Sequence, residues 1–396
     1  MMIDVARARA DTPGCERVLH FNSAGASLMP RQVVDRVISH LELEAAVGGY
    51  RAAREAADEL ADVKVVLAEL LGAADGGDGI ALTDSATRAW DMAFYGLDIG
   101  PGERILTAEA EYASNYLAFL HRARQRGCVV EVVPSTGDGS LDVEALESMI
   151  DDRVKLIAVT HVPTNGGLVN PAAEIGNVAK RHGITYLLDA TQSVGQLPVD
   201  VARIGCDLLA GTSRKYLRGP RGVGFLWVRA PLIDTIDPPF VELQNALWTA
   251  SGEYELVTSA VRFETWESDV AARLGLGSAV RYALGWGIES IQHWVNTLAD
   301  LLRRRLMGIP RILVTDLGLN RCGIVTFTVD GIAAADVASW LQAMDINVEH
   351  SNASSTLLDM QRRGLEGVVR ASVHYFNTEQ EVERFCDEVA VLSRGS

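Results

Sequence analysis

The sequence predicts an α/β protein with a mostly parallel, doubly wound sheet of seven strands, followed by a smaller α+β domain. Seven short apolar runs alternate with stretches of helical periodicity between residues 79 and 229. The runs are nearly continuous in Val, Ile and Leu, which is typical of parallel strands covered by helices on both faces. After residue 286 the pattern changes to helix, two strands, helix, two strands and helix. We therefore expect a large domain at residues 30–285 and a small one formed by residues 1–29 and 286–396.

Composition and charge exclude several other classes of protein. The 396 residues are 48% hydrophobic and 22% charged, a balance that disordered and collagen-like chains do not have. Acidic residues number 52 and basic ones 36, so the formal charge of −16 disfavours a nucleic-acid partner or an anionic membrane surface. No apolar stretch reaches the ~18 residues of a membrane span, and the N-terminus has no apolar leader. We expect a cytoplasmic protein.

Cysteine usage argues against a metal centre. The five cysteines are scattered and form no CxxC pair, so the sequence indicates neither a structural zinc site nor a disulfide framework. We expect no bound metal and reduced, mostly buried thiols. The five are Cys15, Cys128, Cys206, Cys322 and Cys386.

Two helices should precede the first strand. Pro30 opens one helix, which Gly48 and Gly49 close, and a second amphipathic helix covers residues 52–71. We expect both to cover an outer face of the sheet.

The sheet itself should form from residue 79 onward. Apolar runs and helical stretches follow one another as in β-α-β crossovers. The last two runs, within residues 206–229, flank a Gly/Pro turn, which predicts that the sheet finishes with an antiparallel edge or hairpin. The expected strands before that turn are 79–83, 103–106, 128–134, 155–162 and 184–190, and the expected helices are 85–95, 112–126, 143–150 and 172–182.

The small domain should contain three helices and two pairs of strands. No Ser/Gly linker separates it from the large domain, so we expect the two to share a cleft. The expected helices are 291–307, 333–344 and 379–392, and the expected strands are 311–316, 323–329, 346–350 and 367–375.

Lys215 is the most informative residue for chemistry. It closely follows a strand predicted to be buried, within the segment GTSRKYLRGPRGVG. A lone surface lysine would be an ordinary explanation. A desolvated lysine, however, has a lowered pKa that suits imine formation with a carbonyl group.

Asp189 and the segment TDSATRAWDMAF add two further signals. Asp189 ends the apolar run ITYLLDA, and the carboxyl end of a central parallel strand is where a doubly wound sheet presents functional groups. An Asp of this kind can hold a pyridine nitrogen protonated beside a lysine imine. Ser85 and Thr87 open a helix after a strand, where free N–H groups can bind phosphate, although ordinary helix capping would also account for them. Together the signals point to pyridoxal 5′-phosphate.

Six segments, in the same order along the chain, resemble motifs of the class V aminotransferase superfamily of pyridoxal phosphate enzymes. The segments are TDSAT, EYASN, HVPTNGG, LLDATQS, GTSRK and VVRASVHYFNT. Each motif is weak alone, but no other family accounts for the six together. The resemblance covers residues 20 to 390 and implies the fold type I architecture with pyridoxal 5′-phosphate as cofactor.

The resemblance implies a role for each residue of the cofactor site. Lys215 would bond the cofactor and then move protons at the substrate Cα and the cofactor C4′, and Asp189 would pair with the pyridinium nitrogen. Gln192 would donate to the phenolic O3′. Tyr112 stands where the family has a His stacked on the ring, and tyrosine can stack but cannot carry protons at neutral pH as His does. The phosphate contacts would come from Ser85, Ala86, Thr87, Thr212 and Arg214.

The substrate side follows from the same resemblance. Arg370 matches the arginine of the family's RAS motif, which binds the substrate carboxylate through a bidentate pair, and this implies an amino-acid substrate. Thr164 and Asn165 lie where the family contacts O3′ or the substrate. Residues 22–26, with Ala24 at their centre, resemble the family's N-terminal segment over the substrate pocket.

One departure separates this chain from part of the family. Cysteine desulfurases carry a nucleophilic Cys on the loop before the RAS motif, because a thiolate takes the sulfur from the substrate. This chain has no cysteine between Cys322 and Cys386, and Ser354 lies near the expected position. A persulfide-forming desulfurase is therefore disfavoured, and chemistry that needs only the cofactor as electron sink remains.

The segments GGYRAA, EYASN and PTNGGLVNP look most similar to the branch that contains ergothioneine C–S lyase and enzymes of lincosamide antibiotic assembly. This similarity favours C–S β-elimination from a cysteine S-conjugate, releasing a thiol, pyruvate and ammonia, in sulfur-containing secondary metabolism. The alternatives are a decarboxylating, aldehyde-forming enzyme, an aminotransferase or an epimerase acting on a related amino acid. A noncatalytic relative that kept the fold is disfavoured because Lys215 and Asp189 are both present. The resemblance also implies a homodimer with active sites at the subunit interface.

Overall fold

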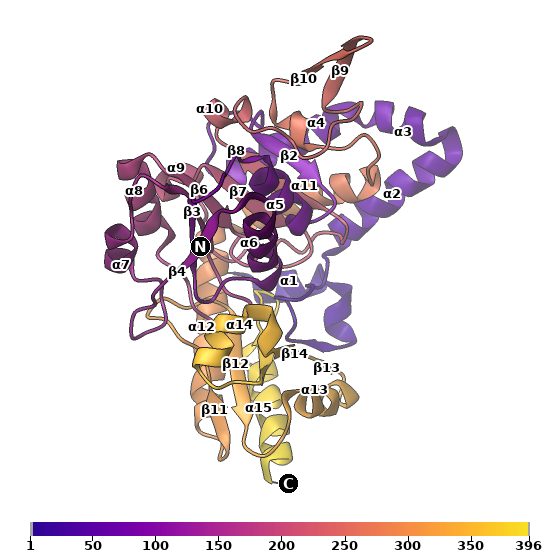
Figure 1. Ribbon diagram of the computed structural model, residues 1–396. Coiled ribbons are helices and arrows are strands. Elements are labelled where there is room, and N and C mark those ends of the chain that lie inside the picture. Colours follow the sequence, from indigo (N-terminus) through magenta and orange to yellow (C-terminus); the bar gives the residue numbers. More distant parts are fainter. Residues whose placement is uncertain (1–2, 395–396) are drawn as a thin grey trace.

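The structure, a computed structural model, describes residues 3–394. A seven-stranded sheet forms the centre of its upper part, with helices on both faces (Figure 1). The strands are β2 (Ile80–Thr83), β3 (Arg104–Ala108), β4 (Val129–Val133), β5 (Val154–Thr160), β6 (Thr185–Asp189), β7 (Leu208–Thr212) and β8 (Gly224–Val228). The helices that follow the strands include α5 (Ala86–Gly96), α6 (Ala113–Arg126), α7 (Val143–Ser148), α8 (Ala172–His182), α9 (Val201–Ile204) and α10 (Ala230–Ile233). The predicted α/β class, with a mostly parallel sheet, is confirmed.

The strand order is β2-β8-β7-β6-β5-β3-β4. β8 runs antiparallel to both of its neighbours, and β3 to β7 run parallel to one another. The predicted hairpin of β7 and β8 is present, but the expectation that it ends the sheet is wrong. β2 pairs with the outer side of β8, with Ile80 opposite Trp227, and forms the edge. Because every run is uniformly apolar, the sequence pattern does not tell which strand lies outermost.

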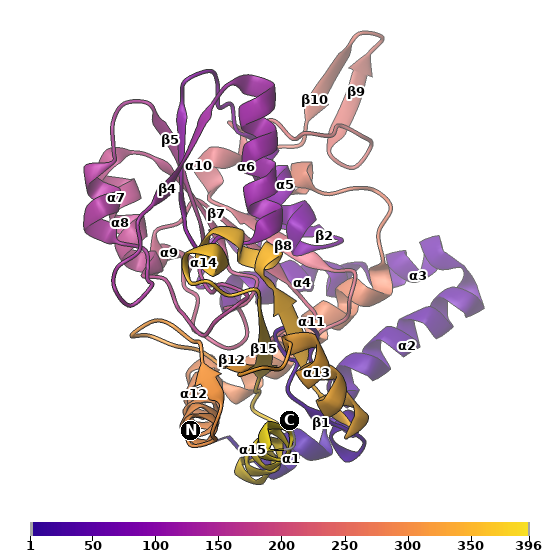
Figure 2. The ribbon, with the colours of Figure 1, turned by 60° about the horizontal axis from the view of Figure 1, so that its bottom comes forward.

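The helices before the sheet differ from the predicted pair. α2 (Arg31–Val47) is as expected, but the predicted helix over residues 52–71 is two helices, α3 (Gly49–Glu55) and α4 (Ala57–Leu70). Ala56, with φ −95° and ψ 7°, leaves helical geometry between them, and Gly48 adopts a φ of +87° that favours glycine. α2 and α3 form an arm that extends away from the sheet (Figure 2), and α2 packs against α11 (Val270–Trp286).

The lower part contains a four-stranded antiparallel sheet in the order β11-β12-β15-β14 (Figure 1). The N-terminal segment also lies in this part, where β1 (Leu19–His20) pairs with β13 (Ile346–Asn347) in a separate two-stranded sheet. The division of the chain at residues 30 and 286 stays a prediction. The remaining elements here are β11 (Ile312–Val314), β12 (Ile324–Val329), β14 (Glu349–Asn352), β15 (Gly367–Ser372), α1 (Val5–Ala10), α12 (Ile288–Met307), α13 (Ala334–Ala343), α14 (Leu357–Arg362), α15 (Glu379–Arg394) and the 3-10 turns η1 (Pro13–Glu16) and η3 (Ala353–Thr356).

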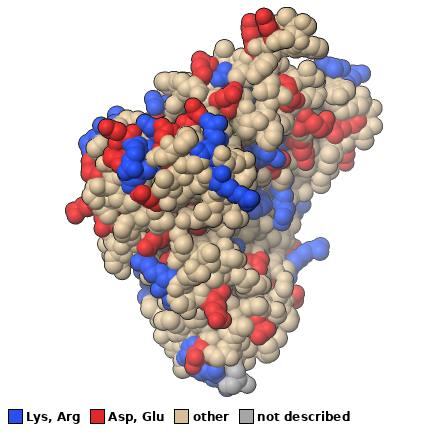
Figure 3. All heavy atoms as spheres, in the orientation of Figure 1, with Lys and Arg blue, Asp and Glu red and all other residues tan. Residues whose placement is uncertain are grey.

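The surface carries one projecting hairpin and a mixed distribution of charge. The hairpin of β9 (Ala246–Ala250) and β10 (Glu253–Leu256) projects from the top of the molecule (Figure 1), and the 3-10 turn η2 (Ala260–Phe263) follows it in the chain. Acidic and basic side chains are interspersed over the face drawn in Figure 3. Within residues 3–394, no helix combines the length and apolar character needed to cross a membrane.

Candidate active site

A cavity lies beyond the carboxyl ends of β3, β5, β6 and β7, where the turns that follow these strands converge. β3 and β5 are neighbours in the sheet, but the chain continues from β3 to β4 in one direction along the strand order and from β5 to β6 in the opposite direction. Such a reversal of strand order opens a crevice that holds ligands in doubly wound sheets. The structure brings together all ten residues predicted for the cofactor site, since the lining includes Ser85, Ala86, Thr87, Tyr112, Thr164, Asp189, Gln192, Thr212, Arg214 and Lys215.

Lys215 lies in the turn after β7 and faces this cavity. Burial lowers the pKa of its ammonium group to about 7, and the positive charges of Arg214 and Arg370 act in the same direction, while Asp189 opposes them. Near neutral pH much of the Lys215 amine is therefore unprotonated. An unprotonated amine is the form that attacks a carbonyl and accepts a proton.

The lowered pKa predicts a pH-dependent cost of folding in the cofactor-free protein. The unfolded chain binds the Lys215 proton up to its ordinary pKa of 10.5, whereas the folded chain releases it near 7. The loss of folding stability caused by burying a charged Lys215 is thus fully present below pH 7 and disappears as the pH rises toward 10.5. Lys215→Met should raise the melting temperature of the cofactor-free protein more at pH 6 than at pH 9, as measured by thermal unfolding at both values. An equal effect at the two values would contradict the lowered pKa.

The amino end of α5 provides an anion seat. Ser85 caps the helix by accepting a hydrogen bond from the Arg88 N–H at 3.1 Å. Ala86 and Thr87, in the first turn, line the cavity, and first-turn N–H groups have no partner within a helix. Gly224 of β8 packs directly beneath this turn, since a Cβ there would lie 2.3 Å from the Ser85 carbonyl carbon. One guanidinium nitrogen of Arg214, Nη1, is buried without a partner. Free N–H groups and an unpaired guanidinium nitrogen fit a phosphate group.

Asp189 ends β6 with its carboxylate held on two sides. The Thr191 N–H donates to Oδ1, and the Asn115 amide donates to Oδ2, each at 2.9 Å. A carboxylate oxygen can accept more than one hydrogen bond, so Asp189 can still receive the N–H of a protonated ring nitrogen.

Gln192 is fixed by the N-terminal segment. Its Nε2 donates to the Ala24 carbonyl oxygen at 3.0 Å, and its Oε1 is buried without a partner. Ala24 itself does not line the cavity. Its carbonyl oxygen instead holds Gln192 in place, and its N–H donates to Ser372 Oγ at 2.9 Å.

Arg370 is not itself part of the cavity lining but bonds Thr164, which is. Its Nη1 donates to Thr164 Oγ1 at 2.6 Å, and its Nε is buried without a partner. Among residues 3–394, no acidic side chain forms an ion pair with it. A buried guanidinium without a counter-ion costs folding free energy, and it is a feature expected where a ligand carboxylate completes the pair.

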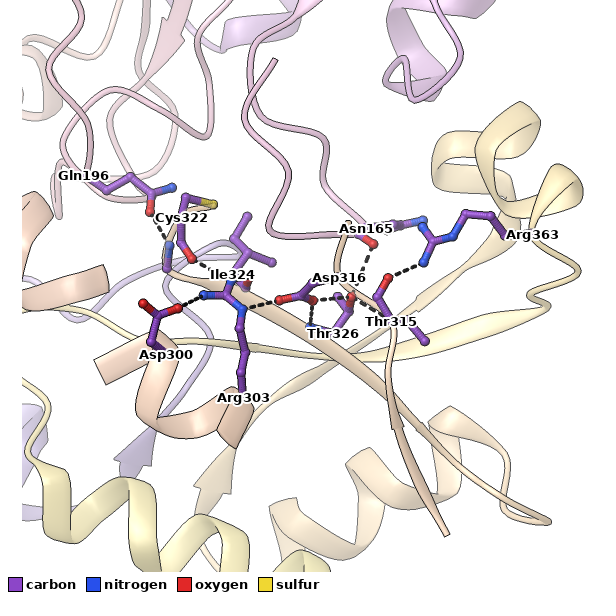
Figure 4. Close-up of polar contacts among 11 residues, drawn as sticks. Asn165, Gln196, Asp300, Arg303, Thr315, Asp316, Cys322, Ile324, Thr326 and Arg363 are labelled. Carbon is purple, nitrogen blue, oxygen red and sulfur yellow. Dashed lines mark hydrogen bonds and ion pairs between the residues drawn. The ribbon is translucent and has the colours of Figure 1, made fainter. Parts of the chain in front are cut away.

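Asn165 does not face the cavity, in contrast to its predicted place near the cofactor or the substrate. Its Nδ2 donates to Thr356 Oγ1 at 3.0 Å and its Oδ1 accepts from Ser351 Oγ at 2.5 Å, so the side chain holds β14 and η3. Its carbonyl oxygen accepts from Thr326, which also bonds Asp316 in a polar network centred on Arg303 (Figure 4). The structure therefore supports a positioning role for Asn165.

The sequence analysis did not single out Asn115, which lines the cavity, or Glu111, which bonds Asn115 from outside the lining. Glu111 and Asn115 lie within EYASN, and the Asn115 Nδ2 donates to Glu111 Oε1 and Asp189 Oδ2. Glu111 lies two residues before α6 and Asn115 lies in the first turn of α6, and this spacing of four residues at a helix start is the signal that could have singled them out.

His374, which lies just after the strand that carries Arg370, has a structural role. Its Nε2 donates to the Tyr216 carbonyl oxygen at 3.0 Å and its Nδ1 accepts from the Tyr375 N–H at 2.8 Å. Burial and the charge of Arg218 lower the pKa of this imidazole far below its usual range. A neutral ring with both nitrogens bonded has no role in proton transfer here.

A family model described as aminotransferase class-V matches residues 19–385. Among curated proteins, a probable cysteine desulfurase of Pyrococcus abyssi is 29% identical over 386 residues, covering 95% of this chain and 94% of that protein. A cysteine desulfurase of Haloferax volcanii is 28% identical over 415 residues, covering 98% and 96%.

Solved structures with the same fold include an apo cysteine desulfurase from Thermococcus onnurineus NA1, with a TM-score of 0.91 and 26% identity over 100% of this chain and 99% of that one. A second is the cystine C–S lyase C-DES in complex with its reaction product cysteine persulfide. It has a TM-score of 0.86 and 25% identity over 96% of this chain and 99% of that one.

Proposed function

The chain belongs to the class V aminotransferase family, whose cofactor is pyridoxal 5′-phosphate, and we propose that it is a C–S β-lyase acting on a cysteine S-conjugate. The products would be a thiol, pyruvate and ammonia, with one water consumed. The similarity to a cystine C–S lyase supports elimination at the substrate Cβ. The resemblance of GGYRAA and neighbouring segments to one branch of the family supports a place in sulfur-containing secondary metabolism.

The residues around the cavity fit the cofactor. The α5 turn with Thr212 and Arg214 would hold the phosphate, Asp189 the ring nitrogen, Gln192 the phenolic oxygen, and Tyr112 one face of the ring. The cofactor, when bound at this site, would supply an electron sink for a bond broken at the substrate Cα, and Lys215 would be the residue that bonds it before the substrate does. Two observations are behind this fit: Arg214 Nη1 is buried without a partner, and Gln192 Nε2 has a second N–H besides the one that it donates to Ala24.

Two side chains would act on the substrate. Arg370, whose Nε is buried without a partner, would bind the α-carboxylate and so fix the orientation of the Cα–H bond. Lys215, with its pKa lowered to about 7, would take the proton from Cα and return one to the departing sulfur.

One observation favours a lyase over a desulfurase. The residues that would hold the cofactor are present, but no nucleophilic thiol accompanies them. The segment 349–366, which precedes the Arg370 strand, contains no cysteine. Burial raises the pKa of Cys322 to about 11, and it raises that of the half-buried Cys15 similarly. With no thiolate to accept sulfur, the sulfur must leave with the group already attached to it.

The enzyme's own cysteine side chains should therefore be dispensable for activity. Cys15→Ala, or treatment of the native protein with iodoacetamide, should leave kcat within about twofold of the untreated enzyme, because none of the thiols is held as a thiolate. The measurement is the rate of thiol release from an S-conjugate before and after alkylation. A complete loss that follows one equivalent of alkylation would contradict the proposal.

The reaction type is tested by the products formed from L-cysteine S-conjugates. Thiol, pyruvate and ammonia in equal amounts would support the elimination. Carbon dioxide with an aldehyde, accumulation of pyridoxamine phosphate, or the D-amino acid would instead identify the decarboxylating, aminotransferase or epimerase alternatives.

A homodimer in the cytoplasm forms part of the same proposal. The β9–β10 hairpin exposes Leu247, Trp248 and Tyr254, which are 64%, 75% and 56% accessible. Apolar side chains concentrated on a projecting hairpin mark a protein–protein contact, and a second copy of this chain is the partner that the family supports.

A further inference from the structure

Glu111 is a buried carboxyl group beneath the wall of the candidate active site. It lies between the end of β3 and the start of α6, it is 3% exposed, and it does not itself line the cavity. Arg214, Lys215 and Arg370 are the cations of the site, but none of them forms an ion pair with Glu111. A carboxyl group buried so deeply needs another reason to be there.

Both oxygens of Glu111 are engaged by surrounding donors. Oε1 accepts from the Tyr112 N–H at 3.0 Å and from Asn115 Nδ2 at 2.9 Å. Oε2 accepts from the Thr160 N–H at 2.9 Å and from Thr107 Oγ1 at 3.1 Å. The Thr160 hydroxyl also bonds Oε1. Glu111 thus joins the ends of β3 and β5 to the first turn of α6.

The Asn115 amide connects this hub to Asp189. Its nitrogen donates to Glu111 Oε1 and to Asp189 Oδ2, at 2.9 Å in both cases. A primary amide has two N–H donors, so these bonds use both of them. The two carboxyl groups therefore hold the amide from opposite sides, and the position of one determines where the other is held.

Charge supports the same arrangement. Burial raises the pKa of Glu111 to about 7, and the negative charge of Asp189 raises it further, while bonds from Thr160 and Asn115 oppose the shift. A Glu111 carboxyl in its neutral form places no second negative charge behind the Asp189 carboxylate.

We propose that Glu111 is a positioning residue for the cofactor, fixing the Asp189 carboxylate through Asn115 and the Tyr112 ring through the Tyr112 N–H. The inference rests on the proposed function, in that Asp189 and Tyr112 are taken to contact pyridoxal phosphate. It adds a buried support whose loss would displace two cofactor contacts at once.

The test measures binding of pyridoxal 5′-phosphate to cofactor-free protein by titration, following the visible absorption band. Glu111→Ala and Asn115→Ala should each weaken binding by about 10- to 100-fold, the range typical for partners that orient a ligand-binding group. The band should shift in both. The double variant should bind no more weakly than the poorer single variant, because the two residues act in one chain of contacts.

The matched control is Glu264→Ala. Glu264 is also 3% exposed and accepts the Leu82 N–H at 3.0 Å, but it lies outside the cavity lining. It should lower the melting temperature and leave the cofactor band in place. If Glu111→Ala and Asn115→Ala behave like this control, with native affinity and an unshifted band, the inference is wrong. If Glu111→Ala does not fold, Asn115→Ala decides alone. A native protein that binds no cofactor would overturn the proposed function, and the inference with it.

Discussion

Lys215→Ala should abolish the visible band of the bound cofactor and lower kcat by on the order of 10³-fold or more. Lys215 is the lysine that lines the cavity, and its amine, with a pKa lowered to about 7, is available for both carbonyl attack and proton transfer. No neighbouring side chain replaces it, because Arg214 and Arg370 keep their protons at any working pH. The measurement is the absorption spectrum of the reconstituted variant together with the rate of thiol release.

Lys155→Ala is the matched control for this experiment. Lys155 lies on β5 of the same sheet but is exposed and bonds the Asp152 carbonyl oxygen, far from the cavity lining. It should retain both the band and the rate. A Lys215→Ala protein that keeps the band, or that retains more than a tenth of the native rate, would remove Lys215 from the chemistry.

Arg370→Ala should lower kcat/KM by about 100- to 1000-fold, the cost of leaving a buried carboxylate without its partner. Arg370→Lys should lose nearly as much, because an ammonium group cannot reproduce the planar fork that meets both carboxylate oxygens. The native enzyme should discriminate strongly against a substrate analogue that lacks the carboxylate. The Arg370→Ala variant should discriminate far less, and steady-state kinetics with the two substrates measures the difference.

Arg122→Lys provides the control for a buried arginine. Arg122 donates to the Tyr95 carbonyl oxygen at 2.6 Å and the Leu97 carbonyl oxygen at 3.0 Å, away from the cavity. Its replacement should lower stability with little effect on kcat/KM. Equal discrimination by native enzyme and Arg370→Ala would show that Arg370 does not bind the carboxylate.

Residues that follow apolar strands could be predicted well from the sequence. Asp189 ends one buried strand and Lys215 follows another, and the carboxyl ends of parallel strands meet at one edge of a sheet, so their convergence follows from topology. The order of the strands did not follow in the same way. β2 and β8 are both short apolar runs, and the choice of edge depends on pairing between segments far apart in the chain.

The sequence also did not predict the direction in which individual side chains point. The motif HVPTNGG placed Thr164 and Asn165 together at the site, but only Thr164 faces the cavity. Asn165 instead bonds Ser351 and Thr356, which are distant in sequence. Glu111 was missed for a related reason, since a buried acid reads as an ordinary polar residue until the structure brings Thr160, Asn115 and Asp189 around it.

The most direct test of C–S β-elimination traces the three-carbon product of a ¹³C-labelled cysteine S-conjugate by NMR. We predict labelled pyruvate, with the thiol released intact on its substituent, because the sulfur leaves with its attached group. Labelled alanine accompanied by a protein-bound persulfide would contradict this mechanism, since sulfur would then have passed to a cysteine of the enzyme.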